Sequence, residues 1–140
     1  MRFMIIRKAD AETEAGMMPS EALIAAMGAY NQEMVDAGIM QAGEGLQPSA
    51  RGARVKFSGG KPTVMDGPFA EAKELIAGFS VIDVPSREDA IAWVKRWPQL
   101  DGGGEVEIEI RPLYELSDFG DSAALEQHLR HREVLAPRQV

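Results

Sequence analysis

The chain has no cysteine among its 140 residues and only two histidines. Without cysteine there is no disulfide framework, no thiolate nucleophile and no cysteine-based metal site. His128 and His131 both lie near the C-terminal end, which argues against a nucleophilic triad. They are three residues apart and could share a helix face with Glu126 or Glu133, but a zinc site needs more fixed ligands. We therefore expect solvated histidines, no metal and no cofactor.

Basic residues and long apolar runs are also scarce. Fifteen lysines and arginines face 22 aspartates and glutamates, which gives a net charge of −7 and a pI of about 4.8. This balance disfavours nonspecific binding to nucleic acids, which needs a basic face, and binding to anionic membrane surfaces. The apolar run at residues 3–6 is too short for a signal peptide or a membrane span. We expect a cytoplasmic protein.

What is present is typical of an ordinary globular domain. Apolar residues make up 45% of the chain and charged residues 26%. A length of 140 residues predicts one domain that can bury a proper core.

The first part of the chain predicts a strand, a helix and a second strand. Arg2–Lys8 is apolar on both sides, which predicts a strand buried on both faces. An acidic, irregular loop at residues 9–18 follows. Ser20 is expected to cap a helix that ends before Gly38 and whose inner face carries apolar residues at helical spacing, namely Leu23, Met27, Tyr30 and Met34. Residues 39–46 then predict a strand.

The second part repeats this order after a hairpin. Residues 54–57 and 63–65 alternate around a turn with two glycines, the pattern of a β-hairpin. A strand at 79–84 and a helix at 86–97 follow, and residues 105–111 alternate strictly, which predicts a last strand with one apolar face. Two helices on one face of a mostly antiparallel sheet give an α+β fold.

Residues 64–74, read V-M-D-G-P-F-A-E-A-K-E, hold the most constrained backbone and the densest charge. Gly67 tolerates backbone angles that other residues resist, and Pro68 suits the first position of a short helical turn. Asp66 is expected to cap that turn, with Glu71 near its positive end. One interpretation is a capped turn with a solvated charged face. The other is a site where Asp66 and Glu71 meet a small ligand.

The same residues resemble a known family. D-G-P-F followed by A-E-A-K-E is similar to the signature of the DGPF proteins, a branch of the YCII-related family. Further similar blocks stand in order along the chain, namely Ala29-Tyr30, Ala37-Gly38, Gly43 to Pro48, Gly78-Phe79 and Ile82 to Val84. The resemblance implies a ferredoxin-like sheet with two helices on one face that pairs into a dimeric α+β barrel. It implies no settled activity, although some members are encoded beside sigma factors of the extracytoplasmic type.

Some YCII relatives use a histidine and an aspartate as an acid–base pair. The helix predicted at residues 20–37 contains no histidine, and Asp36 is the counterpart that the resemblance offers for the aspartate. This departure removes the support for carrying that mechanism over to this chain.

The candidate site therefore rests on the D-G-P-F segment and the helix facing the sheet. The catalytic candidates are Asp66 and Glu71, and the ligand-binding candidates are Tyr30, Asp66, Gly67, Phe69 and Lys73. Carboxylates in a partly apolar cleft can act as general acids or bases. Glu107 and Glu109 share a face of the last strand and are expected to be exposed, to pair with Arg54 and Lys56, or to line an acidic cavity.

Three function classes stay open at this stage. The first is a small-molecule binding or accessory module, with a link to sigma-factor regulation. The second is a small enzyme that uses carboxylate acid/base chemistry on a polar metabolite, and the third is a purely protein-interaction module.

The domain is expected to span residues 1–116 and to form a homodimer. The strand at 79–84, like Arg2–Lys8, is apolar on both faces, and two helices cover only one side of the sheet. A second copy would cover the other side. Residues 101–104 are expected to be a flexible link. Residues 117–140 form a polar extension with a short helix, dispensable for folding, whose few apolar residues could pack on a partner subunit.

Overall fold

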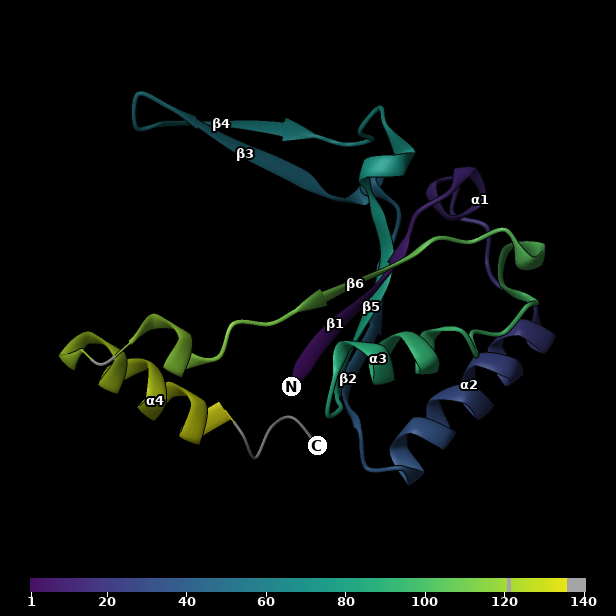
Figure 1. Cartoon of the computed structure of the whole chain (residues 1–140). Coiled ribbons are helices and arrows are strands. Elements are labelled where there is room, and N and C mark those ends of the chain that lie inside the picture. Colours follow the sequence, from purple (N-terminus) through teal and green to yellow (C-terminus); the bar gives the residue numbers. More distant parts are fainter. Residues whose placement is uncertain (121, 136–140) are drawn as a thin grey trace.

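Four antiparallel strands form the central sheet of the protein, in the order β2–β5–β1–β6 (Figure 1). The computed structural model describes residues 1–120 and 122–135. The strands are β1 (Arg2–Lys8), β2 (Met40–Gly45), β5 (Ile76–Asp83) and β6 (Ile108–Pro112). β1 lies between β5 and β6, with Phe3 opposite Ile82 on one side and Pro112 on the other. With its two crossover helices, this is the ferredoxin-like α+β fold that the sequence predicts.

Two helices cover one face of the sheet, and both begin at the predicted caps. They are α2 (Glu21–Asp36) and α3 (Arg87–Val94). The Ser20 hydroxyl accepts the Leu23 amide at 3.1 Å, and the Ser86 hydroxyl accepts the Asp89 amide at 3.2 Å. Gly38 stands at φ +73° just after α2, as expected for a helix C-terminus. α3 stops three residues before Trp97, earlier than predicted.

The core lies between the helices and this covered face. Its buried members come from both sheet and helices, namely Phe3, Ile5, Tyr30, Met34, Ile82, Val84 and Ala90. Because side chains alternate along a strand, Met4 and Ile6 point to the opposite face, with Val81 and Phe79 beside them on β5. These four are only half-buried. The prediction that β1 is buried on both faces is therefore wrong within a single chain, because no element of residues 1–120 and 122–135 covers this open face.

A hairpin forms a second, two-stranded sheet. It consists of β3 (Ala53–Ser58) and β4 (Lys61–Asp66), and its turn holds Gly59 and Gly60 at φ +57° and +79°. Figure 1 shows it projecting away from the central sheet as an arm. Every residue of both strands is exposed.

Shorter elements connect these parts. The loop predicted as irregular at residues 9–18 contains a one-turn helix, α1 (Ala11–Glu14), which Asp10 and Thr13 cap reciprocally. Single 3-10 turns follow along the chain, namely η1 (Ser49–Arg51), η2 (Ala72–Glu74), η3 (Asp101–Gly104) and η4 (Leu116–Phe119). The C-terminal extension contains a helix, α4 (Ala123–Leu135), where the sequence predicts one.

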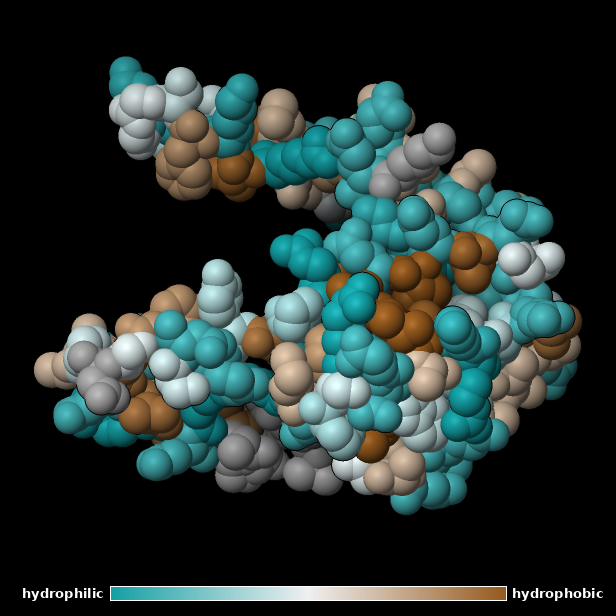
Figure 2. Space-filling model, viewed as in Figure 1, coloured by the Kyte–Doolittle hydropathy of each residue, from teal (hydrophilic) through white to brown (hydrophobic). Residues whose placement is uncertain are grey.

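The arm and the C-terminal segment project to the same side of the molecule. In Figure 1, β3–β4 extends above and η4–α4 below the open face of the sheet, and Figure 2 shows a wide opening between the two. Within the described residues, no helix has both the length and the apolar character needed to cross a membrane.

Candidate functional site

The D-G-P-F segment forms the joint at the base of the hairpin. The Gly67–Pro68 peptide bond is cis, and the Gly67 amide donates to the Gly52 carbonyl at 3.1 Å. A Cβ on residue 67 would stand 1.8 Å from the Ser49 carbonyl oxygen, so only glycine fits. The Phe69 amide donates to the Ser49 hydroxyl at 3.1 Å. The constrained backbone is therefore explained by close packing of the segment on η1.

Contacts on both sides stabilise this joint. The Glu14 carboxylate at the end of α1 accepts the Ser49 amide at 3.0 Å and the Ser49 hydroxyl. The Arg54 guanidinium lies 3.9 Å above the centre of the Phe69 ring, a cation–π contact. Phe69, a predicted ligand contact, is thus engaged by the hairpin itself.

The predicted cap at Asp66 is wrong. Asp66 is the last residue of β4, opposite Ala53, and the ladder holds its backbone extended. Its exposed side chain makes no hydrogen bond within the described part of the chain. The helical turn begins later, at Ala72, and the side chain of Glu71 before it does not cap it. The side chain of Lys73, the remaining candidate of this segment, lies outside the described residues.

Tyr30 is a core residue. Its hydroxyl donates to the Trp93 carbonyl of α3 at 2.7 Å, and its ring meets Trp97 edge-on at 5.6 Å. Burial raises the pKa of Tyr30 to about 12. The structure therefore does not bring Tyr30 and Asp66 together at one site. Asp36, the aspartate suggested by the resemblance, is exposed and accepts a hydrogen bond from Gln32 at 2.8 Å.

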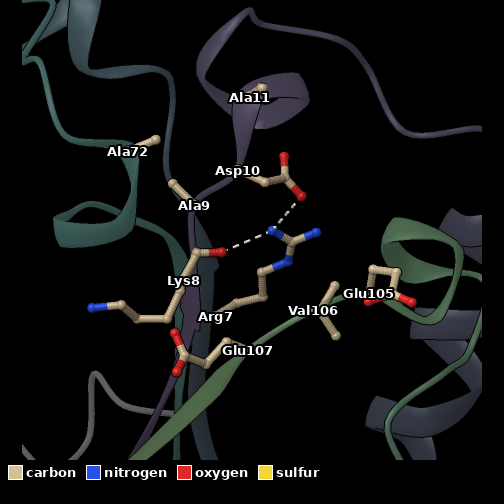
Figure 3. A pocket seen from close by; sticks show the side chains of 9 residues that line it. All are labelled: Arg7, Lys8, Ala9, Asp10, Ala11, Ala72, Glu105, Val106 and Glu107. Atoms are coloured by element: carbon tan, nitrogen blue, oxygen red, sulfur yellow. Dashed lines mark hydrogen bonds and ion pairs between the residues drawn. The ribbon is translucent and has the colours of Figure 1, made fainter.

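A cavity opens instead at the end of β1 (Figure 3). Its volume is about 350 Å³. Four elements build it: the end of β1, the start of α1, η2 and the segment leading into β6. The lining residues are Arg7, Lys8, Ala9, Asp10, Ala11, Ala72, Glu105, Val106 and Glu107. Ala72 belongs to the A-E-A-K-E stretch, so the singled-out segment does reach this cavity, but not through its predicted residues.

Arg7 is the central polar residue of one wall. It points to the helix-covered side of the sheet and meets Asp101 of η3 in a two-pronged pair, with Nε–Oδ2 at 3.1 Å and Nη2–Oδ1 at 2.7 Å. Its Nη1 donates to the Lys8 carbonyl at 2.8 Å and to Asp10 at 3.1 Å, as Figure 3 shows. Trp97 Nε1 completes the network by donating to Asp101 Oδ2 at 2.9 Å.

The charges in this network stabilise one another. Burial alone would raise the pKa of Asp101, but hydrogen bonds from Arg7 and Trp97 outweigh it and hold that pKa below the ordinary value. The Thr13 amide and Arg7 lower the pKa of Asp10 against a smaller effect of burial. The hydrogen bonds that Arg7 donates to Asp101 raise the pKa of Arg7. The wall is therefore a fixed set of charges, and residues 101–104, predicted as a flexible link, anchor it.

The two glutamates predicted on the last strand lie in different environments. Glu107 lines the cavity, which is one of the alternatives that the sequence leaves open. Glu109 lies 3.3 Å from Arg111 in an exposed pair and does not line it. The predicted pairing with Arg54 and Lys56 is not found, because the hairpin that carries these two residues stands apart from β6.

The described residues offer no metal centre. Within residues 1–120 and 122–135, no three histidine, aspartate or glutamate side chains cluster closely enough to hold a metal ion. The two histidines of α4 meet edge-on, with ring centres 6.0 Å apart.

Comparison with known proteins agrees with this architecture. The model of the YCII-related domain matches residues 1–114. The chain belongs to the YCII-related family. The match includes the sheet, both covering helices and all residues that line the cavity, and it ends before α4.

Two further proteins are similar to the chain to different degrees. An uncharacterised protein of Rhizobium meliloti (strain 1021) is 35% identical over 87 residues, which is 62% of this chain and 69% of that protein. Among solved structures, 5-chloro-2-hydroxyhydroquinone dehydrochlorinase from Burkholderia phenoliruptrix AC1100, in complex with 2,5-dihydroxybenzoquinone, is 17% identical. That match covers 86% of this chain and 100% of the other, with a TM-score of 0.43.

Proposed function

We propose that this YCII-related protein is a small-molecule binding module whose site is the cavity at the end of β1. The observation that carries the proposal is the cavity itself, which at about 350 Å³ falls in the size range of small-ligand sites. One wall is held by the Arg7–Asp101–Trp97 network, so the shape is set before a ligand arrives.

The charges around the cavity favour a polar ligand with an amine. Glu105 and Glu107 bring carboxylates to the lining, whereas Asp10 is already bonded to Arg7 and Thr13, and Arg7 also to Asp101 behind the wall. Lys8 is the other cation of the lining. A ligand ammonium group would find acceptors here and form charge-assisted hydrogen bonds.

A thermal-shift screen tests this proposal. We expect amine-bearing polar metabolites to raise the melting temperature, since a ligand that binds only the folded state stabilises it by mass action. Glu107→Gln should weaken binding about tenfold or more, because the neutral amide removes the negative charge that strengthens the hydrogen bond from the ligand ammonium. Glu109→Gln, two residues along the same strand and outside the cavity, is the matched control. Equal binding by wild type, Glu105→Gln and Glu107→Gln would refute the site.

Binding is preferred here over the alternative of a carboxylate enzyme. The nine lining residues include no histidine, and the lowered pKa of Asp10 keeps its carboxyl ionised at neutral pH, which disfavours it as a general acid. Incubating each ligand found in the screen with the protein and following it by mass spectrometry separates the two classes. Turnover that Glu107→Gln abolishes would favour the enzyme.

We further propose that two copies pair through the open face of the sheet. Support comes from Met4, Ile6, Phe79 and Val81, which stand together on the side that α2 and α3 leave uncovered. The same face on a second copy gives a two-fold interface. Sedimentation at micromolar concentration should give twice the 15.3 kDa chain mass. A monomer that keeps its fold would refute this pairing.

Within the family we place the chain in the DGPF branch, on the residues Asp66 to Phe69 and the A-E-A-K-E stretch that follows. The accessory role beside a sigma factor rests on this resemblance alone. Co-purification with a sigma factor encoded beside this chain would test it, and failure to bind such a factor under conditions that preserve the dimer would count against it.

A further inference from the structure

The two faces of the β3–β4 hairpin differ in chemistry. The register pairs Val55 with Val64 and Phe57 with Pro62, so one face is apolar. The other face carries the three basic residues Arg54, Lys56 and Lys61. Val55, Phe57 and Val64 are each more than half exposed, at 52%, 67% and 64%.

Such a hairpin is incomplete by itself. A two-stranded hairpin without a covered face is marginally stable in water, and an exposed apolar strand surface invites pairing with another chain. The contacts that fix the arm in its own chain lie at its base, between Gly67, Gly52 and Ser49. Within the described residues nothing covers its apolar face, so a second chain can supply the missing surface.

Charge favours a second copy of this protein as the source of that surface. The hairpin, β3 through β4, has three basic residues and one acidic residue, a net charge of +2. The whole chain carries −7, so the remainder carries −9. Two such acidic bodies repel each other, and a basic arm reaching onto the partner reduces this repulsion.

An apolar groove is available on the C-terminal segment. It measures about 590 Å³ and lies between η4 and α4, where Leu116, Leu125 and Leu129 line it together with small residues and Glu126. In Figure 1 this segment and the hairpin project from opposite ends of the open face. A two-fold axis between two facing sheets can therefore bring each hairpin opposite the partner's C-terminal segment.

We propose that the hairpin of each copy docks its apolar face on the η4–α4 groove of a second copy, so that two reciprocal clasps close the dimer. The inference rests on the proposed pairing of the sheets, and it adds a second contact at each end of that interface. It gives an occupant to the groove that the half-buried Leu116 and Leu125 and the exposed Leu129 line.

Cysteine crosslinking tests the clasp directly, because the natural chain contains no cysteine. Phe57→Cys and Leu129→Cys are made on separate chains that carry different affinity tags and are co-expressed. A short bismaleimide should then crosslink the two differently tagged chains. Thr63→Cys, on the basic face of the same hairpin, is the matched control and should crosslink to Leu129→Cys at least fivefold less.

A second measurement follows the strength of the dimer. The double variant Phe57→Ser, Val64→Ser should raise the dimer dissociation constant at least tenfold, whereas Thr63→Ser should leave it unchanged.

The outcomes separate the two proposals. A wild-type dimer without the crosslink between Phe57→Cys and Leu129→Cys overturns the clasp and leaves sheet pairing intact. Crosslinks only between two Phe57→Cys positions also overturn it. A wild-type monomer overturns sheet pairing and the clasp together, without touching the cavity.

Discussion

Strands β1 and β3 are both predicted from their apolar side chains, yet their burial differs. β1 has four apolar residues in a row and β3 alternates apolar with polar residues. Phe3 and Ile5 are buried at 1% and 2% exposure, whereas Phe57 of β3 is 67% exposed. β1 has a strand on each side and two helices above it, while β3 pairs with β4 alone among the described strands. An apolar pattern therefore predicts a strand, but its burial depends on which other elements reach it.

The largest expected effect on the free energy of unfolding comes from replacing a phenylalanine in each region, Phe3 in β1 and Phe57 in β3. Phe3→Ala should reduce the free energy of unfolding by about 3–5 kcal/mol, because it leaves a cavity in the core. At protein concentrations low enough to give the monomer, Phe57→Ala should change it by less than about 0.5 kcal/mol, as for an ordinary surface position. Urea unfolding measures both. If Phe57→Ala destabilises the protein by more than this, the effect should grow with protein concentration, since it would act through a second copy. A large effect that is the same at all concentrations would contradict the view that Phe57 is exposed within its own chain.

The next effect concerns the ion pair beside the core. Asp101→Asn leaves the charge of Arg7 poorly compensated and should destabilise the fold by about 3 kcal/mol, the low end for a buried pair, because both side chains are about one-tenth exposed. Glu109→Gln breaks an exposed pair and should change stability by less than about 1 kcal/mol.

The stability difference between wild type and Asp101→Asn should also depend on pH. Because the folded-state pKa of Asp101 lies below its ordinary value of 3.8, the carboxylate stabilises the fold fully above about that pH. This contribution is lost as the pH falls through the lower pKa of the folded state. The stability difference between wild type and Asp101→Asn should therefore shrink below pH 3.8. A difference that stays constant from pH 7 to pH 2 would show that the charge of Asp101 is unimportant.

A smaller effect is expected at the joint between the two regions. Gly67→Ala places a methyl group against the Ser49 carbonyl and should cost about 1–3 kcal/mol, with faster amide exchange in β3 and β4. Gly28→Ala is the control, since an added Cβ there meets nothing within 4 Å, and it should stabilise α2 by about 1 kcal/mol. Equal stability of the two variants would mean that the hairpin base is less tightly packed than its geometry indicates.

The smallest effect belongs to Asp66. Its side chain makes no hydrogen bond within the described residues, so Asp66→Ala and Asp66→Asn should both lie within about 0.5 kcal/mol of wild type. Thermal unfolding of the three proteins side by side measures this. A loss of about 1 kcal/mol in Asp66→Ala that Asp66→Asn restores would revive the predicted cap.

Local signals predicted most of the fold. Ser20, Ser86 and Gly38 mark the helix ends because capping involves only neighbouring residues. The glycine turn marks the hairpin for the same reason. The reciprocal cap of α1 could also have been predicted, because Asp10 and Thr13 stand three residues apart. The acidic residues around this pair favoured an irregular loop instead.

The candidate site could not be predicted in this way. Arg7 and Asp101 are 94 residues apart, and neither stands in a motif. Asp101 precedes three glycines, which is the composition of a flexible link, yet it is buried because Arg7 and Trp97 reach it from other elements. The constrained backbone of the D-G-P-F segment suggested a ligand site, but in the structure it allows close packing against η1.

By itself the sequence determined the order of the main elements, the caps of α2 and α3, the hairpin turn and the α+β fold class, because each depends on neighbouring residues or on the period of apolar side chains. Only the tertiary structure decided which carboxylates share a cavity, that Tyr30 faces α3, and that the hairpin stands apart from the sheet. These depend on contacts between residues far apart in the chain. Such contacts exist only once β1 lies between β5 and β6, and the helices close over one face of the sheet.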